Sequence, residues 1–226
     1  MATQTKKKQN TAAEIVSAYM TQCLEEGQAP ASVYKFSKSL GIEEAEFYQH
    51  FGSLDAVRKG VWQAFFDQTR TRIETDKAFE DYSAREKWLS FYYTFFELLT
   101  LNRSYVTFTL GTSGKPLEQL EQLAGLRALV RDYALETLEA EAPGDGPVKL
   151  RKRRIQLVSE GIWVQTLMLL RFWMRDESPG FQKTDMAIEK SVQTAFDLVD
   201  TAPVERLLDF GKFLLREHFG KPAGSL

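Results

Sequence analysis

The sequence predicts an all-α protein with a small amino-terminal helix-turn-helix domain and a larger helical domain behind it. Apolar residues recur at intervals of three and four along most segments, as they do on one face of an α-helix. No segment alternates apolar and polar residues with the period of a β-strand. The length of 226 residues suffices for two helical lobes, each with its own core.

The stretch of residues 32–57 predicts two short helices that meet at a tight turn. Ser32 can cap the first helix by accepting a hydrogen bond from a backbone N–H. Gly41 can take the left-handed conformation that a sharp turn needs, and Ile42 fills the corner. Apolar or small residues define one face of each helix: Val33, Phe36, Ser37 and Leu40 in the first, and Ala45, Phe47, Tyr48 and Phe51 in the second. This is the pattern of a helix-turn-helix.

These residues resemble the amino-terminal domain of TetR-family regulators, and the resemblance extends from Ala12 to about Gln68. The matching positions are Gly27, Ser32, Val33, Phe36, Ser37, Leu40, Gly41, Ile42, Phe47, Tyr48, His50, Phe51, Ser53 and Val57. The resemblance implies the TetR fold and a dimeric, ligand-responsive regulator, such as a repressor, that binds a DNA operator. It implies phosphate contacts by Ser32, Lys35, Tyr48 and His50, and base contacts by Glu44, Ala45 and Glu46.

The sequence departs from the family pattern where DNA-binding groups are usual. Glu43 replaces the serine or threonine that opens the second helix, and Leu54 replaces a lysine. Residues 12–57 carry two lysines against seven carboxylates, a net charge of −5. Phosphates repel this surface, because cations supply most of the sequence-independent affinity for DNA. The alternative interpretation is structural, since carboxylates at a helix amino terminus also stabilise the helix dipole.

The domain boundaries expected from the sequence follow the helical pattern. We expect a disordered arm over residues 1–10, the helix-turn-helix domain over 11–57, a linking helix over 58–75, and the ligand-binding and dimerisation domain over 76–226. Residues 111–116 and 142–147 are expected to interrupt the helices. Within the large domain, helices are predicted over 117–139, 148–176, 184–199 with Thr184 as the cap, and 203–219.

Aromatic residues are densest in the first part of the large domain. One helix cannot direct aromatic side chains from all its sides at a single neighbour, so this helix is either central to the core or lines a cavity. The sequence leaves both interpretations open. If a pocket for an apolar small molecule exists, the residues expected to line it are Phe91, Tyr92, Phe95, Phe96, Tyr105, Phe108 and Met168.

The helices over 155–174 and 185–199 carry more apolar surface than one neighbour within the protomer can cover. In the TetR family the corresponding helices pack against their copies, so the resemblance also implies a homodimer. The residues expected at the interface are Trp163, Leu167, Leu170, Val192 and Phe196.

A second, shorter resemblance suggests another function. Phe172, Trp173, Asp176, Glu177, Ser178, Pro179 and Thr184 are similar to a stretch of TetR-fold lipid-binding accessory proteins of ubiquinone biosynthesis. Those relatives keep the fold without DNA recognition. The alternative to a regulator is therefore a binding protein for a lipid or another apolar molecule that has lost DNA binding.

Other function classes have little support in the sequence. The single Cys23 lies at an apolar helical position, which indicates a buried thiol and excludes an internal disulfide. The two histidines, His50 and His218, form no catalytic or metal-binding motif, so we expect no enzyme activity, metal or cofactor. No apolar run approaches the roughly 20 residues that span a bilayer, and no signal peptide opens the chain. A cytoplasmic protein is expected.

Overall fold

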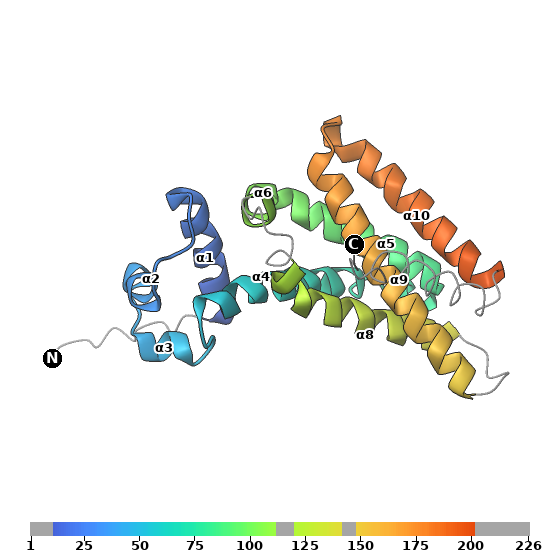
Figure 1. The fold of residues 1–226 in the computed structure, drawn as a ribbon, viewed down its shortest axis with the longest axis horizontal. Coiled ribbons are helices and arrows are strands. Elements are labelled where there is room, and N and C mark those ends of the chain that lie inside the picture. The colour runs from blue at the N-terminus through green and yellow to red at the C-terminus, as the bar shows by residue number, and fades with distance from the viewer. Residues whose placement is uncertain (1–10, 112–119, 142–147, 202–226) are drawn as a thin grey trace, which may run out of the picture. The chain divides into compact units, whose positions relative to one another are not determined.

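The computed structural model describes residues 11–111, 120–141 and 148–201. Over these ranges the chain forms helices and turns with no β-strand, which confirms the all-α prediction (Figure 1). The elements are α1 Ala12–Glu26, α2 Val33–Leu40, α3 Glu44–Tyr48, α4 Leu54–Ile73, the 3-10 helix η1 Lys77–Asp81, α5 Ala84–Leu101, α6 Arg103–Gly111, α8 Ala124–Glu141, α9 Val148–Arg175, the 3-10 helix η2 Pro179–Phe181, and α10 Gln182–Thr201. The expected arm over 1–10 and the expected helix over 203–219 lie outside the described residues.

The described residues pack as two compact units. Of the described residues, 11–76, 94–111 and 120–129 belong to the first unit, and 77–93, 130–141 and 148–201 belong to the second. Helix α5 is shared between the units, since its residues 84–93 belong to the second and its residues 94–101 to the first.

Short polar residues cap the helices of the first unit where the sequence places them. Thr11 and Glu14 form a capping box at the start of α1, which ends at Gly27 with a left-handed φ of 65°. Ser53 Oγ accepts from the amide of Ala56 at 3.0 Å and opens α4. Gly60 on α4 faces the ring of Phe51, and a Cβ there would lie 2.9 Å from that ring. Local sequence therefore sets both ends of α1 and the start of α4. It also allows the close contact between the Gly60 backbone and the Phe51 ring.

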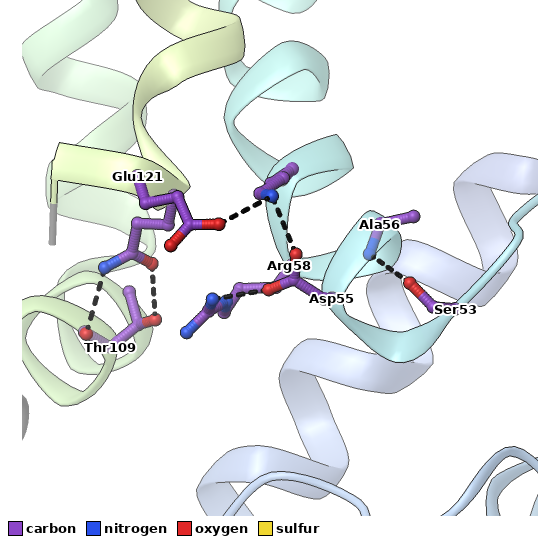
Figure 2. Close-up of polar contacts among 8 residues, drawn as sticks. Ser53, Asp55, Ala56, Arg58, Thr109 and Glu121 are labelled. Atoms are coloured by element: carbon purple, nitrogen blue, oxygen red, sulfur yellow. Dashed lines mark hydrogen bonds and ion pairs between the residues drawn. The ribbon is translucent and has the colours of Figure 1, made fainter. Parts of the chain in front are cut away.

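Two hydrogen bonds between the buried Gln122 carboxamide and Thr109 accompany an interruption of the helix predicted over 117–139. The chain is helical at residues 120–122, turns at Leu123 and resumes as α8 at Ala124. The Gln122 carboxamide donates to the backbone oxygen of Thr109 at 3.2 Å and accepts from the Thr109 hydroxyl at 2.9 Å. These two bonds between Gln122 and α6 are drawn in Figure 2. Because Gln122 is buried, this pairing fixes the chain direction just before the turn.

Aromatic side chains form the core of the second unit. Trp88, Phe91 and Tyr92 of α5 are buried together with Tyr133 of α8. The Trp88 and Tyr133 ring centroids lie 5.0 Å apart, and Trp88 Nε1 donates to Thr137 Oγ1 at 3.0 Å. Packing of this kind is what large aromatic residues contribute to a domain core.

The turn between α9 and α10 differs from the prediction. Helix α10 begins at Gln182, so Thr184 lies inside its first turn and is not the cap. Instead, Asp176 Oδ2 accepts from the Thr184 amide at 2.9 Å and from the Thr184 hydroxyl at 2.7 Å. A carboxylate is a stronger acceptor than a hydroxyl for the unpaired amides of a first turn, so Asp176 supplies the capping interaction from outside the helix.

Candidate nucleic-acid interface and ligand pockets

The helix-turn-helix is held together by its caps and a buried aromatic contact. Ser32 Oγ accepts from the amide of Lys35 at 3.3 Å, and Gly41 closes α2 with a left-handed φ of 68°. The ring of Phe36 on α2 meets the ring of Phe47 on α3 edge-on, with centroids 6.0 Å apart. Tyr19 of α1 packs on the same Phe36 ring, also at 6.0 Å. Helix α1 therefore braces the pair.

The structure brings the predicted DNA-contacting residues onto α2, α3 and the turn after α3. Lys35, Ala45, Tyr48 and His50 are exposed, while Ser32, Glu44 and Glu46 are half-buried. Exposure of the hydroxyl, ammonium and imidazole groups is what phosphate contacts require. Ser32 has already used its side-chain oxygen for the cap, so it offers its hydroxyl proton.

Acidic residues surround the start of α3 without capping it. Glu43 occupies the N-cap position, but its side chain makes no capping hydrogen bond. Its backbone oxygen accepts from the amides of Glu46 and Phe47. Helix α3 has only five residues, so its dipole gives little reason for three carboxylates at this end.

The cations that follow the helix-turn-helix are paired within the protein. Arg58 and Lys59 of α4 both contact the carboxylate of Asp55, and Lys59 Nζ lies 2.8 Å from Asp55 Oδ2. Lys59 Nζ also lies 3.5 Å from Glu121 Oε1. Figure 2 draws the polar contacts of Asp55 and Glu121 as dashed lines. The hydrogen bond with Asp55 raises the pKa of Lys59 and lowers that of Asp55. These pairs reduce the positive charge available for phosphates.

A wide apolar groove of about 690 Å³ lies on the second unit, between α9 and α10. Four exposed apolar residues of α9 line it: Leu157, Val164, Met168 and Phe172, with exposed fractions of 37–68%. Ala187, Thr194 and Ala195 contribute from α10. The spacing of the α9 residues places them on one helical face, so this face presents a continuous apolar stripe to solvent.

The residues predicted at the dimer interface lie mostly on the other face of these helices. Trp163, Leu170 and Val192 are 6%, 3% and 1% exposed within the protomer, and Leu167 and Phe196 are half-buried. Three of the five therefore belong to the protomer core. The exposed apolar stripe consists of other residues of α9, such as Val164 and Met168. Hydrophobic periodicity alone does not distinguish these exposed residues from the buried ones.

The seven predicted ligand-binding residues do not lie in one compact unit. Phe91, Tyr92 and Met168 belong to the second, whereas the other four, Phe95, Phe96, Tyr105 and Phe108, belong to the first. Met168 is 68% exposed, Phe108 is half-buried, and the other five are buried. Tyr92 Oη donates to the backbone oxygen of Ile162 at 3.3 Å and bonds Thr166 Oγ1 at 3.0 Å. Burial raises the pKa of Tyr92, so its phenol is neutral at pH 7. These are features of a packed core.

A second, smaller pocket of about 360 Å³ lies within the first unit, against α1, α4 and the start of α6. Its walls include Val16 and Met20 of α1 and Phe65 of α4. Tyr105, which was predicted as a ligand-binding residue, also lines it. The remaining lining residues were missed, because no local signal marks side chains that only the tertiary structure brings together.

Comparison with known proteins supports the fold. The family model for the tetracyclin repressor-like C-terminal domain matches residues 87–214. A TetR-family transcriptional regulator structure from Syntrophomonas wolfei has a TM-score of 0.61 at 12% identity, covering 85% of this chain and 96% of its own. The fatty acid degradation regulator FadR from Bacillus halodurans is 19% identical with a TM-score of 0.47, covering 86% and 96%. A search of the curated proteins found no match.

A capped helix-turn-helix unit at the amino terminus, followed by further helices, defines an all-α regulator fold. The matched model covers more than half of the chain, and the chain therefore belongs to the TetR family. Over the described ranges, no helix is long and apolar enough to cross a membrane.

Proposed function

We propose that the protein is a dimeric, ligand-responsive transcriptional regulator that binds a DNA operator in the cytoplasm. The observation that carries this proposal is the helix-turn-helix itself. Its caps and its buried Phe36–Phe47 contact are complete, while Lys35, Tyr48 and His50 are exposed. Exposed hydroxyl, ammonium and imidazole groups on this face can donate hydrogen bonds to phosphates. No catalytic role is proposed.

The proposed organisation follows the expected boundaries. Residues 11–57 bind DNA, 58–75 link, and 76–226 bind ligand and dimerise. The apolar stripe on α9 supports the dimer, because an exposed stripe of this length is costly for a monomer in water. A second copy covering that stripe places two recognition helices in one molecule, which suits a two-fold symmetric operator.

Selection from random DNA duplexes at low salt tests the regulator proposal. We expect an enriched, inverted-repeat sequence, bound with a salt dependence that is shallow for a regulator, because few cations face the DNA. Titration of the enriched site should give a Kd well below the roughly 10⁻⁴ to 10⁻⁶ M of non-specific association. If nothing is enriched and binding stays in that range, the proposal fails.

The alternative proposal is a TetR-fold protein that binds a lipid or another apolar molecule and no longer reads DNA. The acidic start of α3 and the pairing of Arg58 and Lys59 with carboxylates favour it. Native mass spectrometry after mild extraction distinguishes the two: the alternative predicts a co-purified apolar molecule together with no retention on heparin. Retention on heparin and an enriched duplex would exclude it.

A further inference from the structure

The pocket within the first unit has the size of a small-molecule site. Its volume of about 360 Å³ falls at the lower end of the range of roughly 300–1,000 Å³ that ligand pockets occupy. It is lined by Ala13, Val16, Ser17, Met20, Thr21 and Leu24 of α1, Ala64, Phe65 and Gln68 of α4, and Leu101, Asn102, Ser104 and Tyr105 at the end of α5 and the start of α6.

The lining combines apolar with uncharged polar side chains and carries no formal charge. Val16, Phe65 and Tyr105 are buried walls, while Leu24 and Leu101 are 44% and 72% exposed. None of the thirteen lining residues is a lysine, arginine, histidine, aspartate or glutamate. Because an ion loses hydration when it enters such a site and gains no charged partner, the pocket favours an uncharged molecule.

Carboxamide and hydroxyl groups give the pocket hydrogen-bonding capacity. Asn102 Nδ2 donates to the backbone oxygen of Leu98 at 2.9 Å, which fixes the carboxamide and leaves its oxygen as an acceptor. Gln68 adds an exposed carboxamide, and Ser17, Thr21 and Ser104 add hydroxyls. Six of the thirteen lining side chains carry a hydroxyl or carboxamide group, so hydrogen bonds can orient a small ligand there.

Tyr105 connects the pocket to the helix-turn-helix. Its side chain is 1% exposed, and its hydroxyl has no hydrogen-bond partner of good geometry within the described structure. Burial, together with nearby Tyr19 and Cys23 of α1, raises the pKa of Tyr105, so the phenol is neutral. Tyr19 in turn packs on Phe36 of the helix-turn-helix. A molecule that contacts Tyr105 and α1 is therefore close to Tyr19, whose contact with Phe36 helps to position α2.

We propose that this pocket binds a small uncharged molecule with an apolar body and one amide or hydroxyl group. Occupancy biases the position of α1 and, through the Tyr19–Phe36 contact, the position of the helix-turn-helix. This regulatory consequence rests on the proposed function, because it requires that the protein bind DNA. Binding to the pocket does not, so the two can fail separately.

Saturation-transfer NMR on the full chain tests the site with benzamide as the probe. A molecule of this size should bind with a Kd of about 1–10 mM. Benzoate and benzylamine, which have the same ring but carry a charge, should give at least tenfold weaker signals. Ala13 and Ala12 are adjacent exposed residues at the start of α1, but only Ala13 lines the pocket. Ala13→Phe should therefore reduce the benzamide signal at least tenfold, while Ala12→Phe should leave it unchanged.

Three results would overturn the proposed site. The first is an equal benzamide signal from the two variants, as expected if the probe sits in the α9–α10 groove. The others are equal signals from benzamide and benzoate, and a benzamide signal that does not saturate. Circular dichroism checks that Ala13→Phe is folded. If it is not, Gln68→Leu at an exposed position replaces it and should weaken benzamide at least threefold. If the protein binds benzamide but enriches no DNA sequence, the proposed site is supported and the regulator proposal fails.

Discussion

Asp176 and Thr184 are joined by two hydrogen bonds across the turn between α9 and α10, in which the Thr184 amide and hydroxyl donate to the same carboxylate oxygen. The other oxygen of Asp176 accepts from the amide and hydroxyl of Ser178 at 2.8 and 2.6 Å. Trp173 packs on Phe181 beside this turn. The residues that resemble lipid-binding accessory proteins therefore include a structural turn, and their presence alone is no evidence for a lipid.

The Asp176 cluster predicts a pH dependence of stability. Burial alone raises the pKa of Asp176, but the hydrogen bonds from Ser178 and Thr184 outweigh it and hold the pKa well below its usual range. The contribution to stability is present above the unfolded-state pKa of about 3.9 and is lost as pH falls through the lower folded-state pKa. Asp176→Asn should lower Tm at pH 7 and flatten the acid side of the stability curve. Asp132→Asn, an exposed change in the middle of α8, should do neither. Equal acid profiles for wild type and Asp176→Asn would contradict this account.

Two glycines of the first unit should respond oppositely to alanine. Gly41 has a φ of 68°, and a Cβ there meets no atom within 4 Å, so the cost of Gly41→Ala comes from the backbone alone. We expect a loss of about 1 kcal/mol in the free energy of unfolding. Gly52 lies outside the left-handed region and also has open space, so Gly52→Ala should be neutral or slightly stabilising. Urea unfolding of both variants measures the difference in the free energy of unfolding. Similar values for the two variants would show that the turn at Gly41 does not require a left-handed conformation.

The apolar stripe predicts which substitutions dissociate the proposed dimer. Met168→Glu places a charge on the exposed face of α9 and should convert a dimer into a folded monomer at micromolar concentration. Leu120→Glu changes a leucine that is 49% exposed in the first unit and should leave the dimer intact. Trp163→Glu buries a charge in the protomer core and should unfold the chain instead. Light scattering with circular dichroism separates these results, and a monomeric wild type would end the proposal.

The sequence predicts those elements whose ends depend on local chemistry. Ser32 caps α2 as predicted, and Thr11 and Ser53 cap α1 and α4 in the same way, because a hydroxyl reaches an amide three residues ahead whatever the rest of the chain does. Cys23 is 1% exposed, as its place in the helical pattern predicts. Ser32 and Ser53 are also among the positions that resemble the TetR amino-terminal domain.

Features that depend on distant residues could not be predicted in the same way. The break at Leu123 follows from the pairing of Gln122 with Thr109, and the start of α10 follows from Asp176. The two faces of α9 are both apolar in sequence, so periodicity alone does not tell the core residue Trp163 from the exposed Met168. The pocket in the first unit joins three helices, and residues such as Gln68 and Asn102 carry no sequence signal of their own.

Membership of the TetR family favours DNA binding, whereas the negative charge of the helix-turn-helix domain opposes it. A substitution at Leu54 tests which of the two effects dominates. It is half-buried at the first position of α4, directly after the Ser53 cap, in the place where the family pattern has a lysine. Leu54→Lys adds a cation beside the helix-turn-helix, next to Asp55, whose charge is already shared by Arg58 and Lys59. If the helix-turn-helix faces DNA, this cation should strengthen binding to all duplexes by roughly two- to fivefold at low salt.

The salt dependence makes this result specific. One added phosphate contact should steepen the slope of log K against log salt concentration by about 0.9, since that is the counterion release per phosphate. Met186→Lys makes the same change in net charge on α10, at a residue that is 51% exposed, and provides the matched control. Fluorescence anisotropy with one enriched and one scrambled duplex measures both slopes. Equal effects of the two substitutions would mean that the overall charge of the protein attracts the DNA. They would also mean that the start of α4 makes no contact with a DNA phosphate.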